Sequence, residues 1–310
     1  MQRYIGIDLG GTNIKGALVS ETGKILKQRS VPTHAEAGAE AVTKTIAAMI
    51  CALAEGESVS GVGMGCPGTV DDQEGTVVYA CNLGWVHYDV RTALRELTGY
   101  SVRLVNDANA AAMGEAWLGS AKGVQNVVMV TIGTGVGGGV IVNGDVVSGV
   151  VGAGGEIGHM CLNPAEEHTC GCGGHGHLEQ YSSATGVVSN YLAECKKAGV
   201  EPIELTGPSD SKDVFQACRE GDKLALAAAD TMADYLGRAL ALIANVVDPE
   251  MFLIGGGASA SVDVYLDAVR EHFQRYALSA SRETPIKVAS LGNDAGIIGA
   301  AYVALRAAGK

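Results

Sequence analysis

The chain has 310 residues, of which 47% are hydrophobic, and a formal net charge of −12 at pH 7. This length predicts two domains of ordinary size. The acidic balance, with no basic cluster longer than Lys196-Lys197, argues against nucleic-acid and anionic-membrane partners. No apolar run approaches ~18 residues and no basic-then-apolar leader precedes the first strand-like segment, so we expect a cytoplasmic protein that binds small molecules.

The first third of the chain alternates strands and helices. Residues 4–11, 14–20 and 24–31 predict three strands, the first two joined by a glycine turn. Apolar residues at helical spacing then predict a helix over 35–55. It is followed by a strand at 62–65, a tight turn at 66–68, a polar region, a helix over about 89–98, and a strand at 102–105 that leads into an alanine-rich helix.

From Val127 the pattern restarts, because residues 127–147 again predict a strand, a glycine turn and a strand. Aligning Gly10-Gly11-Thr12 with Gly133-Thr134-Gly135 indicates an internal duplication, and hence two α/β lobes. The second half then predicts an irregular insertion at 152–180, helices around 183–198, 211–220 and 222–246, a strand at 251–257, a helix, a strand at 286–290 and a terminal helix from about 295.

The glycine turns indicate phosphate binding, but by neither common nucleotide motif. Gly133, Gly135 and Gly138 fit G-x-G-x-x-G, yet a strand follows them where a dinucleotide site needs a helix, and no P-loop sequence occurs. The remaining interpretation is a pair of hairpin turns that offer backbone N–H groups to phosphate across a cleft. Asp8 precedes the first turn and is suited to orient a phosphate-bound Mg²⁺ through water.

Eight cysteines in a reducing compartment are better interpreted as thiols or metal ligands than as disulfides. Only Cys170 and Cys172 lie close together, within the stretch HTCGCGGHGH at 168–177. The other six are predicted to be small buried hydrophobes: Cys51, Cys66, Cys81, Cys161, Cys195 and Cys218.

Several segments together resemble one family. They are IGIDLGGTNIKGALV, GCPGTVD, NLGW, NDANAAA, VTIGTGVGGGVIVNG, GGEIGHM, the C-x-C stretch and LEQYSSATG. In this order the chain resembles the ROK (repressor, open reading frame, kinase) sugar kinases, most closely their bacterial glucokinase branch. The resemblance implies a two-lobed, actin-like ATPase fold with a ribonuclease-H-like sheet in each lobe. The expected lobes are 1–118, with helix 296–310 returning to it, and 119–295, with a zinc loop at 159–177.

The resemblance also implies an activity, ATP- and Mg²⁺-dependent phosphorylation of a hexose. Glucose is the expected acceptor, and N-acetylmannosamine, fructose, allose or mannose are alternatives within the class. A sugar sensor without catalysis is the competing class, and the presence of the base and both phosphate turns argues against it. The family further implies a homodimer. The first phosphate turn begins so early that we expect no helix-turn-helix module before it.

Matching the family's motifs residue by residue assigns roles in this chain. Asp107 corresponds to the catalytic base, although an Asp before an alanine-rich helix is also a good N-cap. Sugar binding falls on Gly68, Asn82, Asn106, Asp107, Glu156, His159 and Glu179. ATP binding falls on Asp8, Gly10, Gly11, Thr12, Gly133, Thr134, Gly135, Gly255, Gly256 and Gly257.

The family's structural zinc pattern is altered here. It has a histidine, about ten residues, and then C-x-C-G-x-x-G-C before Leu-Glu. This chain has His159, Cys170 and Cys172, with His177 in place of the last cysteine. Imidazole also binds zinc, so a site of two cysteines and two histidines is chemically sound, with His168 and His175 as competing ligands. We expect zinc to order the sugar-binding segments and to leave ATP binding largely unaffected.

Overall fold

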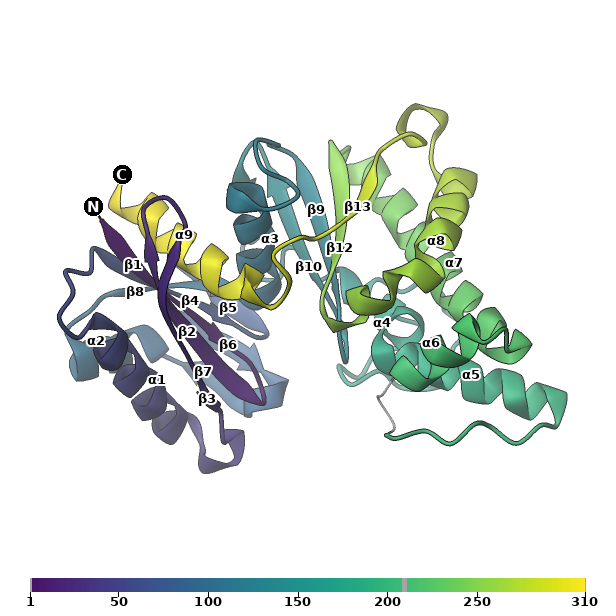
Figure 1. Ribbon diagram of the computed structural model, residues 1–310, viewed down its shortest axis with the longest axis horizontal. Helices are drawn as coiled ribbons and strands as arrows, with labels where there is room; N and C mark the ends of the chain where they lie inside the picture. The colour runs from purple at the N-terminus through teal and green to yellow at the C-terminus, as the bar shows by residue number, and fades with distance from the viewer. Residues whose placement is uncertain (1, 208–210, 310) are drawn as a thin grey trace. The chain divides into compact units, whose positions relative to one another are not determined.

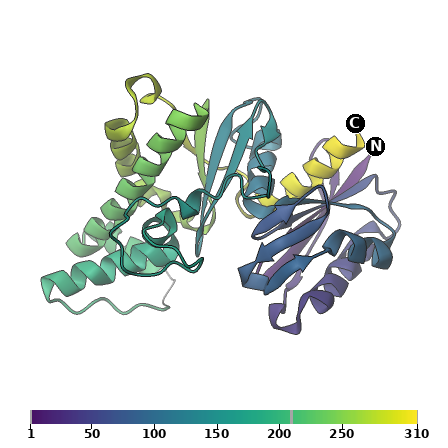
Figure 2. The same ribbon diagram turned by 180° about the vertical axis from the view of Figure 1, so that it is seen from behind.

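The computed structural model describes residues 2–207 and 211–309. The chain forms two compact units. Unit 1 contains the chain up to Val127, Gly139–Gly155 and the chain from Ser290 onward, and unit 2 contains Val128–Gly138 and Glu156–Ala289. Figures 1 and 2 show the elements of each unit from opposite sides. No helix within the described ranges has both the length and the apolar character needed to cross a membrane.

Unit 1 is built on a five-stranded sheet. β1, β2 and β3 pair antiparallel, whereas β4 and β8 run parallel to β1. Residues at the carboxyl ends of β1, β4 and β8 therefore meet at one edge of the sheet, where Asp8 pairs with Gly65 and Cys66 with Asn106. The order is β3 (Ile25–Pro32), β2 (Asn13–Ser20), β1 (Arg3–Leu9), β4 (Gly61–Cys66) and β8 (Val102–Asn106).

Helices cover this sheet through apolar faces. The faces of α1 (Ala39–Ala54) and α2 (Val90–Thr98) bury leucine, isoleucine and valine side chains in the larger core cluster. α9 (Ala295–Ala308) approaches β1 and β4 closely, because a Cβ at Gly6 or Gly63 would collide with backbone carbonyls of α9. α9 therefore lies directly against the strands of unit 1, as Figure 1 shows in yellow over purple.

A second, three-stranded antiparallel sheet occupies the region that the sequence predicted only as polar. Its strands are β5 (Thr69–Asp71), β6 (Thr76–Ala80) and β7 (Trp85–Tyr88). The indole ring of Trp85 is buried and packs edge-to-face against Tyr88, with 4.9 Å between ring centroids. The sheet is anchored to the main core by this ring and by Val70 and Val77.

The second five-stranded sheet repeats the strand order of the first. Numbered along the chain within each sheet, the strands of both run third, second, first, fourth, fifth, which agrees with the predicted duplication. The order is β11 (Asp145–Val146), β10 (Val136–Val142), β9 (Val127–Ile132), β12 (Met251–Gly255) and β13 (Ile286–Val288), and the boundary between the units runs through β10.

The helices of unit 2 follow the predicted positions closely. They are α5 (Ala184–Ala198), α6 (Ser211–Arg219), α7 (Lys223–Val247) and α8 (Val262–Tyr276). Within the predicted irregular insertion lie two short elements that the sequence did not reveal, the 3₁₀ turn η3 (Ile157–His159) and the helix α4 (Leu178–Ser182). The predicted lobe boundaries at residues 118 and 295 stay a prediction.

One expectation about the cysteines was partly wrong. Cys66, Cys195 and Cys218 are buried, but Cys51, Cys81 and Cys161 are exposed. Cys51 lies on α1 and Cys81 in the 3₁₀ turn η2 (Cys81–Leu83), on faces turned away from the core. A small apolar residue in a helical pattern does not by itself reveal which face it occupies.

Candidate functional site

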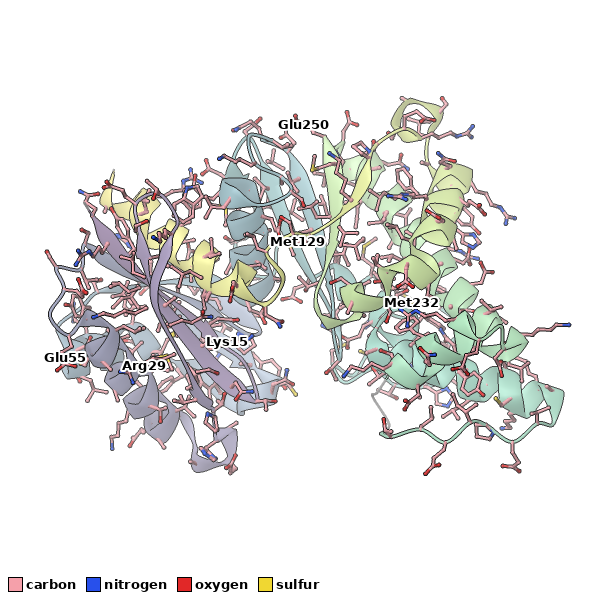
Figure 3. All side chains as sticks on the ribbon, viewed as in Figure 1. Lys15, Arg29, Glu55, Met129, Met232 and Glu250 are labelled. Carbon is pink, nitrogen blue, oxygen red and sulfur yellow. The ribbon has the colours of Figure 1, made fainter. Side chains whose placement is uncertain are left out.

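Asp8 lies near the carboxyl end of β1, in a crowded position. It is half-buried, and it pairs across the sheet with Lys15, which is labelled in Figure 3. Burial raises the pKa of the Asp8 carboxyl, and the positive charge of Lys15 opposes that shift. A Cβ at Gly296 would collide with this carboxylate, so the first turn of α9 needs glycine there. The carboxylate is suited to a cation bound at the end of β1.

The turn after β1 is short and fixed by hydrogen bonds. Gly10 donates its N–H to the carbonyl of Asn13 at 3.0 Å, and the hydroxyl of Thr33 donates to the carbonyl of Gly10 at 2.6 Å. Gly11 and Thr12 are exposed. A Cβ at Gly11 would lie 3.5 Å from the Cβ of Asn82, so the structure brings these two predicted site residues together.

Asn106 and Asp107 begin helix α3 (Asp107–Leu118) at the carboxyl end of β8. Asn106 is the N-cap, because its Oδ1 accepts from the N–H of Asn109 at 3.1 Å, and its Nδ2 donates to the carbonyl of Gly68 at 3.0 Å. Asp107 is the first helical residue, and its Oδ1 accepts from the N–H of Ala108 at 2.8 Å. The alternative that Asp107 caps the helix is therefore wrong, since Asn106 has that role.

The second glycine turn, Gly133–Gly135, joins β9 to β10 in unit 2. Gly133 donates to the carbonyl of Gly135 at 2.9 Å, and Thr134 is exposed. Gly256, with φ +83°, packs so closely that a Cβ would collide with the backbone of Ile132. The predicted residues Gly255, Gly256 and Gly257 therefore lie at the same edge of the second five-stranded sheet as this turn, because β12 is the neighbour of β9.

Three predicted sugar ligands gather in unit 2. Oε2 of Glu156 lies 4.0 Å from Nε2 of His159. Burial raises the pKa of Glu156, while His159 opposes the shift and the negative charge of Glu179 adds to it. Glu179 accepts a hydrogen bond on Oε2 from the backbone N–H of Val136 at 2.9 Å. The cluster can accept hydrogen bonds from hydroxyl groups, as sugar recognition requires.

His159, Cys170, Cys172 and His177 form one compact group, with their ligand atoms all within 4.8 Å of one another. Sγ of Cys172 lies 3.3 Å from Nδ1 of His177. Zinc bonds of ~2.0–2.3 Å in a tetrahedron separate the ligand atoms by roughly 3.3–3.8 Å, so these residues fit zinc with small adjustments. Burial and the charge of His159 lower the pKa of His177, which favours the neutral imidazole that binds metal.

The two competing histidines are engaged elsewhere. Nδ1 of His168 lies 2.9 Å from the carboxylate of Glu166, and Nδ1 of His175 lies 3.2 Å from the carbonyl of His168. Neither residue belongs to the compact group. The geometry therefore favours His177 as the fourth ligand.

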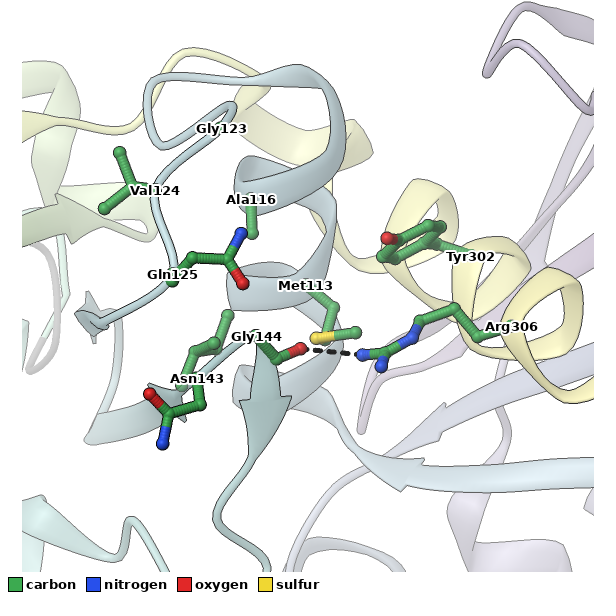
Figure 4. Close-up of a pocket in the computed structure, with 10 residues that line it drawn as sticks. Met113, Ala116, Gly123, Val124, Gln125, Asn143, Gly144, Tyr302 and Arg306 are labelled. Atoms are coloured by element: carbon green, nitrogen blue, oxygen red, sulfur yellow. Dashed lines mark hydrogen bonds between the residues drawn. The ribbon is translucent and has the colours of Figure 1, made fainter. Parts of the chain in front are cut away.

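A separate hollow in unit 1 includes none of the predicted site residues. It lies beside α3 and α9, and Arg306 reaches across it to the carbonyl of Gly144 at 2.7 Å (Figure 4). The same guanidinium also pairs with Asp145 at 2.6 Å. The positive charge of Arg306 is thus already paired with Asp145, so this side chain offers no unpaired charge to a ligand in the hollow.

Comparison with known proteins agrees with this arrangement. The model of the ROK family matches residues 4–307. This chain belongs to the ROK family. It is 38% identical to a glucokinase of Halalkalibacterium halodurans, over 97% of this chain and 94% of that protein. It is 39% identical to a glucokinase of Thermotoga maritima, over 97% and 96% of the two chains.

Solved structures give the same family assignment. A ROK family glucokinase from Streptomyces griseus, solved in complex with glucose and AMPPNP, is similar with a TM-score of 0.83 and 34% identity. The match covers 98% of this chain and 99% of that chain. The fold is thus the two-lobed, actin-like α/β fold of the ROK sugar kinases.

Two polar residues of this ROK protein contact the predicted site but were not predicted from sequence. Gln180 hydrogen-bonds the metal loop, and the hydroxyl of Thr185 donates to the carbonyl of Thr134 at 2.9 Å. Ser183 is the N-cap of α5, accepting from the N–H of Gly186 at 3.0 Å. A serine directly before the helix was a usable signal for the cap. The contact of Thr185 with Thr134 spans 51 residues of sequence and had no such signal.

Replacing Asp8 with asparagine should stabilise the fold at neutral pH. The folded state raises the pKa of Asp8, so ionising it costs stability at pH values above that raised pKa. The cost is absent below the unfolded pKa of ~3.9, where the carboxyl is neutral in both states. Urea unfolding should show the stability gain of Asp8→Asn at pH 7.5 and a smaller gain at pH 4.5. A variant less stable than the parent at both values would contradict the assigned burial.

Proposed function

We propose that this ROK protein is an ATP-dependent glucokinase, which converts glucose and ATP to glucose 6-phosphate and ADP. The observation that carries the proposal is the placement of Asp107. It begins α3 at the carboxyl end of β8, and its neighbour Asn106 is bonded to Gly68. A carboxylate at this strand end is suited to receive a proton from a sugar hydroxyl as the oxygen attacks the γ-phosphoryl group.

Glucose is the proposed acceptor because several full-length relatives carry that activity in their names and one solved relative contains glucose and AMPPNP. We assign hydroxyl recognition to Gly68, Asn82, Asn106, Glu156, His159 and Glu179. We assign the nucleotide to Asp8, the two glycine turns and Gly255–Gly257. Mg²⁺ bound with ATP would neutralise charge on the phosphates, and Asp8 is the carboxylate suited to orient it. A homodimer stays our expectation from the family.

A structural zinc is proposed for His159, Cys170, Cys172 and His177. Two thiolates and two neutral imidazoles balance the +2 charge of the ion, so the site is formally neutral. The family pattern with three thiolates would carry −1. The metal would join η3, which bears His159, to the loop before Glu179, and so fix two of the proposed sugar-binding segments relative to each other.

A panel of hexoses tests the proposed substrate. ADP release should be most efficient with glucose as acceptor, and lower with N-acetylmannosamine, fructose, allose and mannose. The quantity to compare is kcat/KM at saturating MgATP. A value for N-acetylmannosamine above that for glucose would reassign the acceptor, and no ADP release with any hexose would contradict the kinase proposal.

Replacing Asp107 with asparagine should remove the base and leave the fold intact. We expect turnover to fall by ~10²–10⁴-fold with a much smaller change in glucose affinity, because acid–base catalysis contributes in that range. Asp89→Asn is the matched control, since Asp89 caps α2 by accepting from Thr92 and lies outside the predicted site. Near-normal turnover in Asp107→Asn would show that another group takes the proton.

The zinc ligands can be tested by metal analysis. The purified protein should hold one zinc per chain, His177→Ala should lose or weaken it and raise the sugar KM, and His177→Cys should retain it. His168→Ala and His175→Ala are matched controls in the same loop and should keep the metal. Stoichiometric zinc in His177→Ala with an unchanged sugar KM would show that another group completes the site.

A further inference from the structure

The helix α4 connects the loop that bears the proposed metal ligands with the Gly133–Gly135 turn, to which the proposed function gives separate roles. It has five residues, begins directly after the metal ligand His177, and is followed by Ser183, the N-cap of α5. One of its ends contacts the metal loop, and its residue Glu179 and the start of α5 contact the Gly133–Gly135 turn. The segment 177–185 therefore bridges the two.

On the metal-loop side, Gln180 makes two hydrogen bonds through one side chain. Its Oε1 accepts from the backbone N–H of His177 at 3.0 Å, and its Nε2 donates to the carbonyl of His168 at 2.9 Å. Leu178 adds a backbone bond to the carbonyl of Met160 at 2.9 Å. The position of α4 thus depends on the conformation of the loop that supplies the metal ligands.

On the side of the turn, three hydrogen bonds hold two of its residues and the residue that follows it. Ala184 donates its N–H to the carbonyl of Gly133 at 2.8 Å, and the hydroxyl of Thr185 donates to the carbonyl of Thr134 at 2.9 Å. The Glu179 carboxylate accepts from Val136, and a Cβ at Gly135 would collide with that carboxylate. The shape of the turn is therefore set by residues of the bridging segment.

The bridge itself is firmly packed. The hydroxyl of Ser182 is fully buried and donates to the carbonyl of Met232 on α7, labelled in Figure 3, at 2.8 Å. The ring of Tyr181 stacks on Tyr235 with 3.7 Å between centroids and 3° between planes. The Tyr181 hydroxyl donates to Glu166 of the metal loop at 2.5 Å, which lowers the pKa of Glu166 to about 2. The bridging segment is thus restrained by α7 and by the metal loop between its two ends.

We propose that Gln180 and Thr185 are positioning residues, through which ordering of the metal loop holds the Gly133–Gly135 turn in the shape that binds nucleotide phosphates. The identities of zinc and nucleotide rest on the proposed function. The consequence differs from the expectation drawn from the sequence, that zinc leaves ATP binding largely unaffected. Couplings of this kind typically change affinity by about 5–150-fold, and we expect a value near the lower limit.

The first experiment uses the full chain without sugar. The Kd of Mg-AMPPNP is measured by calorimetry for the zinc-loaded protein and after chelation, together with hydrogen exchange of the amides at 133–136. Removing zinc should weaken Mg-AMPPNP about fivefold or more and accelerate exchange in this segment. Equal affinity and equal exchange in the two forms would overturn the proposal, and so would a protein that retains no zinc.

Variants of Thr185 separate positioning from general destabilisation. Thr185→Val removes the hydroxyl at nearly constant volume, so zinc removal should then change Mg-AMPPNP affinity much less than in the parent. Thr185→Ser keeps the hydroxyl and should restore the full zinc dependence. Ser189→Ala is the matched control on the same helix, since Ser189 bonds the carbonyl of Thr185 and not the turn. An unchanged zinc dependence in Thr185→Val would overturn the role of Thr185.

The metal-loop end is tested by Gln180→Met, which keeps the length of the side chain and removes both hydrogen bonds. In the zinc-loaded form it should accelerate exchange at 133–136, although Gln180 itself does not bond that turn. Exchange indistinguishable from the parent would overturn its role. If Mg-AMPPNP fails to bind the parent while exchange still responds to zinc, the ATP assignment fails and the coupling stands.

Discussion

The hydrogen bond from the backbone N–H of Val136 to the Glu179 carboxylate is the interaction around which unit 2 is organised. Val136 is buried, so leaving its N–H unpaired would cost about 1–3 kcal/mol. A Cβ at Gly135 would collide with the Glu179 carboxylate, and a Cβ at Gly158 would collide with the carbonyl of Val136. Because His159 follows Gly158, the glycine turn, the acidic cluster and the first metal ligand all depend on the backbone at this one position.

Unit 1 also gathers predicted site residues at the carboxyl ends of its strands, in the same strand order but with different side chains. The carboxyl ends of β1, β4 and β8 bring Asp8, Gly68 and the pair Asn106-Asp107 to one edge of the sheet. Here the constraint is close helix packing, because α9 must begin against the Asp8 carboxylate and needs Gly296 there. The duplication thus supplied the scaffold twice, and the side chains at the strand ends differ between the copies.

Much of this fold could be predicted from the sequence, because long elements carry strong periodicity. The helices α1, α5 and α7 and the paired hairpin strands were expected close to their observed bounds. The sheet β5–β7 and the helix α4 were missed, since segments of three to five residues are too short to show a period. The N-cap alternative weighed for Asp107 fell one residue from the observed cap, Asn106, which is the usual uncertainty at a helix end. The contact of Thr185 with Thr134 could not be predicted, because neither residue's sequence surroundings indicate the other.

Reciprocity between the two proposed ligands of unit 2 gives the most direct test of the account. If metal and nucleotide phosphates share one supported turn, each must strengthen the other's binding by the same factor. The measurement is zinc affinity, by competition with a chelator of known affinity, in the absence and presence of saturating Mg-AMPPNP. We expect Mg-AMPPNP to tighten zinc binding by the same factor by which zinc tightens the binding of Mg-AMPPNP. A zinc affinity that saturating nucleotide leaves unchanged would contradict it.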